Sequence, residues 1–457
     1  MMALNCVNRF KSAFLNRRPR SKPQTSLHSR VHSVEVLEGR QLMATFAVTN
    51  LHDSGPGSLR HAIVASNARP GADTIQVDVT GAFQTGRTAL PPITGNVTIA
   101  DDAGHVVQIK ASSRHVVIVN GDSGSGTRYY NSDLVSTQPV SGWQGLRGGD
   151  KGQLLISGTS GSNGLLLVGA INGKGKTYTV NVPGATSTSV YGPNNLPGNR
   201  IQLVGSYRTS TSATGPVEVN GFVYQGTLAQ LKSGGGTYTT IDYAGAKFNY
   251  VHSTMGGLAV GNYDGPTSNG LPLGPGNAYI YNVQTAKFVT NITFPGSLSD
   301  TAYGIWYNGG TSYTICGGYS PLPVNNLADQ GHPLGQAYLV DYDSATGQFS
   351  HWTSFSAPSG LLGGNLVTHF EGISSVKNGV YTLSADSVQV GPNGGAQGSV
   401  VTVRRNKNGT FGEASWANLN YPGSAGITSS NSVFGNQVVG IVISPTGTFS
   451  FQATVKG

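Results

Sequence analysis

Two acidic residues, Glu371 and Asp386, are the strongest candidates for catalysis in the second half of the chain. They stand in the segments HFEG and SADS, within stretches that otherwise alternate like apolar strands. A glycosidase needs two carboxyl groups facing each other across a sugar, one of them with a raised pKa. No matched acid occurs at the corresponding place of a neighbouring segment, so the two residues indicate catalysis only as an alternative.

Aromatic residues near these acids suit the binding of sugars. Aromatic rings stack on sugar rings, but in sheet proteins they also pack between sheets. The sequence leaves both roles open for one set of candidate ligand-binding residues, which consists of Tyr303, Trp306, Trp352, His369 and Phe370.

Metal and phosphate sites have weaker support. The segment DYDSATGQF places Asp341 and Asp343 at alternate positions, as in a calcium loop, but it lacks the later bidentate Glu and makes a good hairpin turn. We therefore expect no cofactor, with calcium as the alternative. The segments GGDKG and GKGKT do not match a phosphate-binding loop.

A repeat of 56 to 63 residues predicts the architecture that carries these residues. Its opening strands start at residues 164, 221, 277, 336 and 399, and each is followed by three more short strands. Four strands repeated five times are typical of a β-propeller, in which packing around an axis buries both faces of each sheet. We predict an all-β fold with a propeller of about five blades at 161–457, closed by the final segment GTFSFQATVKG. A count of six that uses residues 126–160 is the alternative.

Small residues recur in the closing strand of each unit. Gly205, Gly261, Gly317 and Gly440 share one position, and Ala385 takes it in the fourth unit. Small side chains there predict a close approach of neighbouring backbones.

The first part of the chain predicts a different module. Residues 58–67 place Leu59, Ala62, Ile63 and Ser66 on one helical face, and short strands such as TIQVDV and NVTIADD follow. We expect a short β-helix-like module with one capping helix at 45–125 and a linker or irregular edge at 126–160.

Charge and composition exclude several classes of protein. The formal charge is +8, but residues 1–40 carry +6 of it, so the remaining body is nearly neutral and lacks the basic face of a nucleic-acid-binding protein. Two cysteines exclude a disulfide framework, and no apolar stretch predicts a transmembrane helix. Residues 1–44 are expected to be a basic, disordered leader.

Three segments resemble known families. The leader segment VEVLEGRQLMA resembles the LEPR-XLL motif of exported bacterial proteins, with Gly39 where the family has Pro. The segment VTNLHDSGPGSLRHAI resembles the first turn of right-handed parallel β-helix proteins. The segment GFVYQGTLAQLKSGGGTYTTIDYAGA resembles HAF-type extracellular repeats. These resemblances imply an extracellular or cell-surface destination after export.

Together these features predict an exported, non-catalytic propeller that acts in cell-surface interaction, adhesion or envelope structure. Its expected partner is a surface glycan or an envelope protein. The alternative is a carbohydrate-active enzyme, a glycoside hydrolase or lyase, that uses Glu371 and Asp386.

Overall fold

The computed structural model divides the chain into two units, residues 1–121 and 122–457. The structure describes residues 44–50, 52, 54–69, 72–77, 96–101, 127–131, 142–172, 175–209, 218–264, 276–321, 335–358, 366–389, 396–419, 421, 427–444 and 447–455. The leader predicted at 1–44 lies outside this part of the chain, apart from Ala44. No helix among the described residues has the length and apolar character needed to cross a membrane.

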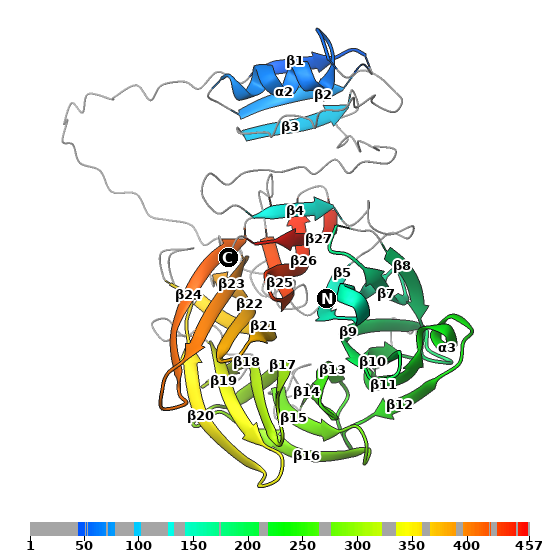
Figure 1. Cartoon of the computed structure of the whole chain (residues 1–457), viewed down its shortest axis with the longest axis vertical. Helices are drawn as coiled ribbons and strands as arrows, with labels where there is room; N and C mark the ends of the chain where they lie inside the picture. Colours follow the sequence, from blue (N-terminus) through cyan, green and yellow to red (C-terminus); the bar gives the residue numbers. More distant parts are fainter. Residues whose placement is uncertain are drawn as a thin grey trace, which may run out of the picture. The chain divides into compact units, whose positions relative to one another are not determined.

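The first unit contains a parallel three-stranded sheet and one helix (Figure 1). The strands are β1 (Thr45–Val48), β2 (Ala72–Val77) and β3 (Asn96–Asp101). Helix α2 (Leu59–Asn67) begins after Ser58, whose hydroxyl accepts a hydrogen bond from the N–H of His61 at 3.2 Å. Its buried residues are those predicted from the sequence, so this helix is confirmed. Residues 102–125 of the module predicted at 45–125 lie outside the described residues.

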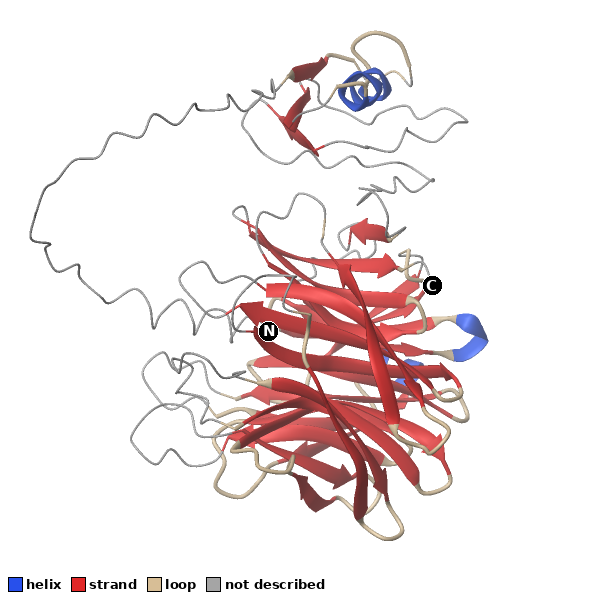
Figure 2. Ribbon diagram, turned by 90° about the vertical axis from the view of Figure 1, so that its left-hand side faces the viewer, coloured by secondary structure: helices blue, strands red, loops and turns tan. Residues whose placement is uncertain are grey.

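The second unit is a β-propeller, and strands account for nearly all of its regular structure (Figure 2). Four of its sheets are separate and have four antiparallel strands each. The first consists of β5 (Gly142–Gly148), β6 (Leu154–Ser160), β7 (Asn163–Gly169) and β8 (Gly175–Val180). The second consists of β9 (Ser187–Leu196), β10 (Arg200–Arg208), β11 (Asn220–Thr227) and β12 (Thr237–Ile241). The third consists of β13 (Asn249–Met255), β14 (Leu258–Asp264), β15 (Gly276–Asn282) and β16 (Lys287–Ile292). The fourth consists of β17 (Ser299–Gly309), β18 (Ser312–Ser320), β19 (Gln336–Asp343) and β20 (Gln348–Phe355).

The remaining eight strands form one sheet that divides at a single residue pair, Gln397 with Thr428. One half consists of β21 (Leu366–Lys377), β22 (Val380–Gln389), β23 (Ala396–Arg405) and β24 (Phe411–Leu419). The other half consists of β25 (Ile427–Phe434), β26 (Gln437–Ser444), β27 (Gly447–Thr454) and β4 (Arg128–Asn131). The last strand of the chain therefore pairs with a strand that precedes the first blade.

Six strands surround the centre of the propeller: β5, β9, β13, β17, β21 and β25 (Figure 1). Each contacts the next, and β25 contacts β5, so the ring is closed. The ring has one more inner strand than the five predicted units. Residues 126–160, expected to be a linker or an irregular edge, supply β4, β5 and β6 instead.

The predicted repeat unit has four strands, as a blade does, but it starts at a different strand. Its opening strands are β7, β11, β15, β19 and β23, which are third in their sheets. Each predicted unit therefore joins the outer half of one blade to the inner half of the next. The final segment was expected to pair into the first blade, but β27 pairs with β26 and β4.

Burial follows the position of a strand in its blade. Strands such as β10 are covered on both faces by neighbouring blades, so Ile201–Tyr207 are all buried. The outer strand β24 alternates between exposed and covered side chains, because solvent covers one of its faces. The middle strands therefore show apolar runs and the outer strands show alternation, as the sequence does.

Candidate functional site

Every inner strand of the propeller has a β-bulge at the same height. In each one the register with the second strand skips a single residue, and a bulge of this kind re-aims the side chain of the extra residue. The six bulged residues, which we call the bulge belt, are Gln144, Tyr191, His252, Tyr303, Glu371 and Asn431.

Ring contacts show that bulged residues of neighbouring blades meet. The ring centroids of Tyr191 and His252 are 5.4 Å apart, and those of His252 and Tyr303 are 4.8 Å apart. The ring of Tyr303 lies 5.9 Å from that of His369, which precedes the Glu371 bulge on β21. Tyr191, His252, Tyr303 and His369 therefore form a row of ring contacts across four consecutive inner strands, β9, β13, β17 and β21.

Small residues opposite each bulge make it possible. A Cβ atom on Gly261 would lie 1.9 Å from the carbonyl oxygen of Tyr250, and one on Gly317 would lie 1.9 Å from that of Thr301. The same close approach occurs at Gly205 and Gly440. The predicted close approach of backbones is confirmed, and the approaching backbone is the inner strand of the same blade.

Glu371 and Asp386 lie together in this region. Glu371 is the bulged residue of β21, and Asp386 is on β22 opposite His369. Asp386 accepts hydrogen bonds from the Ser429 hydroxyl at 2.5 Å and from the Ser430 N–H at 2.7 Å. These two bonds join β22 to β25, so Asp386 also holds two blades together.

Burial changes the protonation of both acids. It raises the pKa of Asp386 to about 7. Burial and the negative charge of Asp386 raise the pKa of Glu371 well above its usual value. Glu371 therefore keeps its proton to a higher pH than an exposed Glu, and its protonated form can donate a hydrogen bond. The side chain of Glu371 is 14% exposed and that of His369 is 25% exposed, with Nδ1 and Oε1 3.9 Å apart.

The two acids do not form a complete glycosidase pair. Such a pair needs a second carboxylate that reaches the substrate or a water molecule. Asp386 is only 4% exposed, and both of its oxygens already accept hydrogen bonds from β25. The arrangement supplies a proton donor at the belt but no accessible base.

The rest of the belt is uncharged at neutral pH. Burial lowers the pKa values of His252 and His369 to about 4, so both rings are neutral. His252 Nε2 lies 2.8 Å from Asn262 Oδ1, and Asn431 donates a 2.6 Å hydrogen bond to the Trp143 carbonyl. Tyr191, His252 and Asn431 are buried and already hydrogen-bonded. The belt residues that stay partly exposed are Gln144, Tyr303 and Glu371, with His369 beside them.

Arg147 forms the layer directly below the belt. It comes from β5, but its guanidinium donates to the carbonyls of Ile305 (3.0 Å) and Ile373 (2.9 Å) and to the Ser253 hydroxyl (3.1 Å). These partners lie on β17, β21 and β13, which are not neighbours of β5 in the ring. The Arg147 side chain therefore crosses the centre of the propeller and closes it at this height.

The predicted aromatic residues divide into two groups. Tyr303 and His369 lie at the belt. Phe370 is fully buried, and Trp306 packs against the same core between the fourth and fifth blades. Trp352 packs against Phe294 at 5.4 Å. These last three residues therefore have the packing role that the sequence left open.

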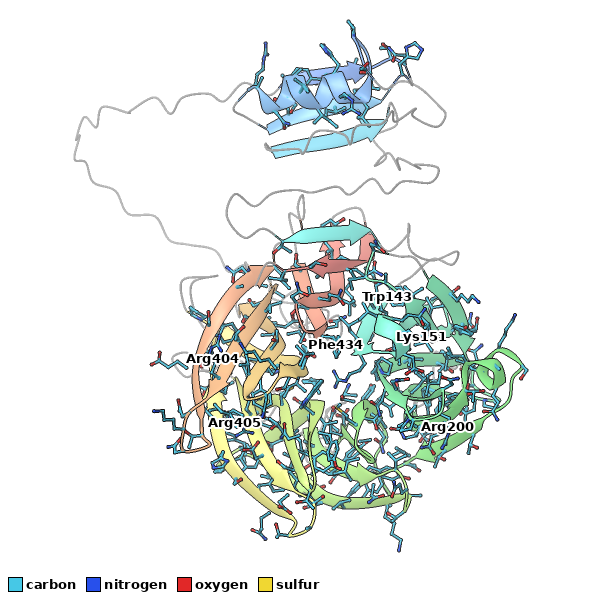
Figure 3. All side chains as sticks on the ribbon, viewed as in Figure 1. Trp143, Lys151, Arg200, Arg404, Arg405 and Phe434 are labelled. Carbon is cyan, nitrogen blue, oxygen red and sulfur yellow. The ribbon has the colours of Figure 1, made fainter. Side chains whose placement is uncertain are left out.

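The predicted calcium ligands do not converge. Asp341 is bound by Arg405 at 2.5 and 2.8 Å and lies 2.8 Å from His351 Nδ1, which fixes β19 to β23 (Figure 3). Asp343 accepts hydrogen bonds from the N–H groups of the turn that follows it. Each carboxylate therefore has a structural role where it stands.

Replacing Glu371 with Gln is expected to raise the melting temperature. The rise at pH 8 should exceed the rise at pH 5 by about 2 °C or more. Unfolded Glu loses its proton near pH 4.5, whereas folded Glu371 keeps it. The stability that this group contributes is present below pH about 4.5 and is lost as the pH rises toward its folded pKa, because ionisation then favours the unfolded chain. Gln does not ionise and escapes this loss.

Thermal unfolding at both pH values measures this effect, with Glu413→Gln as the matched control. Glu413 is exposed on the outer strand β24. An equal shift for Glu371→Gln at pH 5 and pH 8 would contradict a raised pKa.

Several solved structures resemble the chain at low identity. They include a xylan β-1,4-xylosidase from Bacillus halodurans (11% identity, 61% of this chain and 56% of that chain, TM-score 0.36). They also include a β-1,2-mannobiose phosphorylase from Listeria innocua (8%, 74% and 93%, TM-score 0.36) and a glucose dehydrogenase (10%, 71% and 98%, TM-score 0.37). No protein-family model and no curated protein sequence matches the chain. At these TM-scores the likeness assigns no activity to this propeller.

Proposed function

We propose that the propeller is an exported interaction protein that binds a neutral, hydroxyl-rich ligand, a surface glycan, at the bulge belt without cleaving it. The observation that carries the proposal is the belt itself, in which each of six inner strands contributes one bulged side chain. Bulges are frequent next to functional sites, where they re-aim side chains. A purely structural ring needs no such set of polar and aromatic groups.

The chemistry of the belt favours an uncharged ligand. Neutral His369, the Glu371 carboxyl group with its raised pKa and the Gln144 amide supply donors and acceptors. Tyr303 supplies an aromatic face, which suits the apolar face of a sugar ring. Asp386 accepts hydrogen bonds from β25 and so does not face the ligand, and the Arg147 guanidinium lies below the belt.

The first unit and the leader extend this proposal. The three parallel strands of the first unit are consistent with a short β-helix-like module. With the LEPR-XLL-like leader, this module fits a protein that is exported and acts at the cell surface or outside the cell. An envelope protein remains the alternative partner.

Binding of uncharged oligosaccharides to the full chain tests the proposal, with released sugar measured in the same samples. Tyr303→Ala should weaken binding at least about tenfold, because a stacked ring contributes about 1–3 kcal/mol. Tyr307→Ala, on the same strand beyond the belt, should bind like the parent protein. Equal binding by both variants, or no binding by the parent protein, would overturn the proposal.

A carbohydrate-active enzyme is the second candidate, because Glu371 has the raised pKa of a general acid. Glu371→Gln separates the two functions. It should bind like the parent protein in both cases, but it should abolish sugar release only in an enzyme.

A further inference from the structure

The second blade has a connection that differs from those of three other blades. Between β11 and β12 the chain forms helix α3 (Leu228–Lys232), followed by a glycine-rich turn. The equivalent connections at 283–286, 344–347 and 406–410 are short turns or loops. A capping box between Thr227 and Gln230 fixes the start of the helix. The sequence thus specifies an additional element at this place on the outer edge of the propeller.

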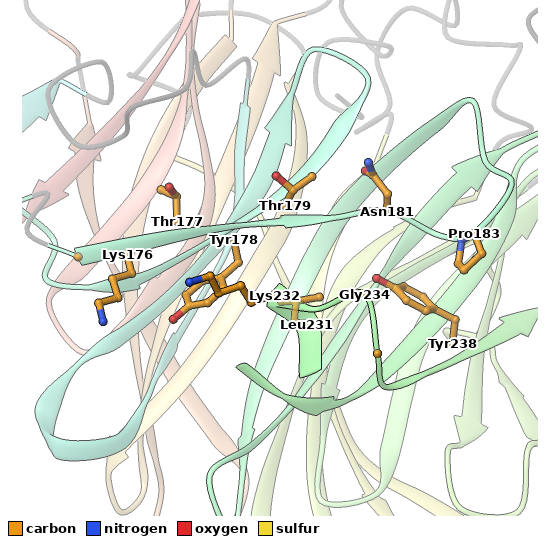
Figure 4. Close-up of a pocket in the computed structure, with 12 residues that line it drawn as sticks. Lys176, Thr177, Tyr178, Thr179, Asn181, Pro183, Leu231, Lys232, Gly234 and Tyr238 are labelled. Atoms are coloured by element: carbon orange, nitrogen blue, oxygen red, sulfur yellow. The ribbon is translucent and has the colours of Figure 1, made fainter. Parts of the chain in front are cut away.

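Helix α3 and the turn enclose a pocket of about 760 Å³ against β8 of the first blade. Figure 4 shows β8 on one side with Lys176 and Tyr178, and α3 with β12 on the other side with Lys232 and Tyr238. Its volume is in the range of small-molecule sites. We call it the rim pocket.

The tyrosine side of the pocket is held rigidly. The ring of Tyr238 lies 4.8 Å from that of Tyr224, and the Tyr224 hydroxyl donates a 3.1 Å hydrogen bond to the carbonyl of Gly235. Tyr178 and Tyr238 also pack against the buried core that includes Leu231. Two aromatic side chains are therefore fixed in place while they line the pocket.

The charged residues that line the pocket are all positive. Lys176 and Lys232 are exposed, and no acidic residue lines the pocket. Neither lysine has an ion-pair partner within the described part of the chain. The charged residues in the pocket lining are these two lysines.

We propose that the rim pocket binds an acidic saccharide, a sugar chain whose rings carry carboxylate groups. The two ammonium groups provide point charges for a carboxylate, and Tyr178 offers a ring face for the sugar. Thr177 and Thr179 also border the pocket, but Figure 4 shows their side chains on the opposite face of β8 from Lys176 and Tyr178. This site is separate from the bulge belt, and the proposal does not depend on the function of the belt.

Titration of the full chain with trigalacturonate, followed by calorimetry at low salt, tests this proposal. The double variant Lys176→Gln, Lys232→Gln should bind at least about tenfold more weakly. The control Lys287→Gln, at an exposed position on the outer strand β16, should bind like the parent protein. Glu371→Gln at the belt should also leave trigalacturonate binding unchanged.

Two further probes separate saccharide recognition from charge alone. Maltotriose, which is neutral, should bind at this site at least about tenfold more weakly than trigalacturonate, as judged by competition. Pyrophosphate should not displace trigalacturonate at equal concentration. Unchanged binding by the double variant, or displacement by pyrophosphate, would overturn the proposal. If Tyr178→Leu folds normally, it should also weaken binding, and full affinity in that variant would exclude a sugar stacked on Tyr178.

Discussion

Replacing Arg147 with Met is expected to destabilise the propeller by about 3 kcal/mol or more. Met fills similar space and removes a buried charge, which is favourable, but it leaves the Ile305 and Ile373 carbonyls without their donor. The Ser253 hydroxyl loses the Arg147 hydrogen bond and keeps only the one from the Ile305 N–H at 3.4 Å. Each unsatisfied buried group costs about 1–3 kcal/mol. Because the three groups belong to three blades, their loss loosens the centre of the ring.

Denaturant unfolding of the full chain measures this loss, with Arg200→Met as the control. Arg200 is exposed at the start of β10, and its replacement should change stability by less than about 0.5 kcal/mol. Arg147→Lys should also be destabilised, because a single ammonium group does not reproduce the planar fork of Arg. A parent-like midpoint for Arg147→Met would show that the three hydrogen bonds contribute little.

Replacing Gly261 with Ala is expected to cost about 1–3 kcal/mol, because the new methyl group overlaps a backbone carbonyl. The added Cβ would lie 1.9 Å from the Tyr250 oxygen and 2.7 Å from the Tyr279 hydroxyl. The strands must shift beside the His252 bulge to relieve this overlap. The fifth blade carries Ala385 at the same position and keeps its bulge, so a blade can accommodate one methyl group when its other residues are adapted to it.

Gly235→Ala is the matched control, since its new Cβ would meet no atom closer than 3.6 Å. Thermal unfolding should separate the two variants by several degrees. The Gly261→Ala protein should also bind a belt ligand more weakly, because His252 leaves its place. Equal stability of the two variants would contradict the role of Gly261 in forming the bulge.

Much of the propeller can be predicted from the sequence, because strand periodicity and turn residues are local signals. The phase of the repeat cannot, since a cycle of four strands has the same period wherever it is cut. Strands β7 and β11 have the clearest apolar runs because neighbouring blades cover both of their faces. The predicted repeat units therefore start at these strands. The inner strands are less apolar because they carry the belt.

The count of five units has a related cause. The last blade takes β4 from residues 128–131, whereas its other strands lie at 427–454. A four-residue strand that pairs over this distance has no local signature. The first two strands of the first blade lack a preceding unit, and so they resemble a linker.

The sequence singles out only two belt residues, Glu371 and Tyr303. Acids in apolar strands stand out, whereas Gln144, Tyr191, His252 and Asn431 are ordinary residues for a strand. The regular signal is the small residue that follows each of them, such as Gly192 and Ser253, and the glycine opposite the bulge. That signal reports where a bulge forms, but the type of the bulged side chain differs from blade to blade.

The pairing of β4 with β27 also determines how the protein responds to a pulling force. The first unit, residues 1–121, connects to the propeller directly before β4. Tension applied through that unit therefore reaches the ladder from Arg128–Thr454 to Asn131–Phe451 before any other part of the ring. Four residue pairs form this ladder, so we expect it to separate first under load. When β4 separates from β27, the last sheet loses its outer strand, while the inner strands still enclose Arg147.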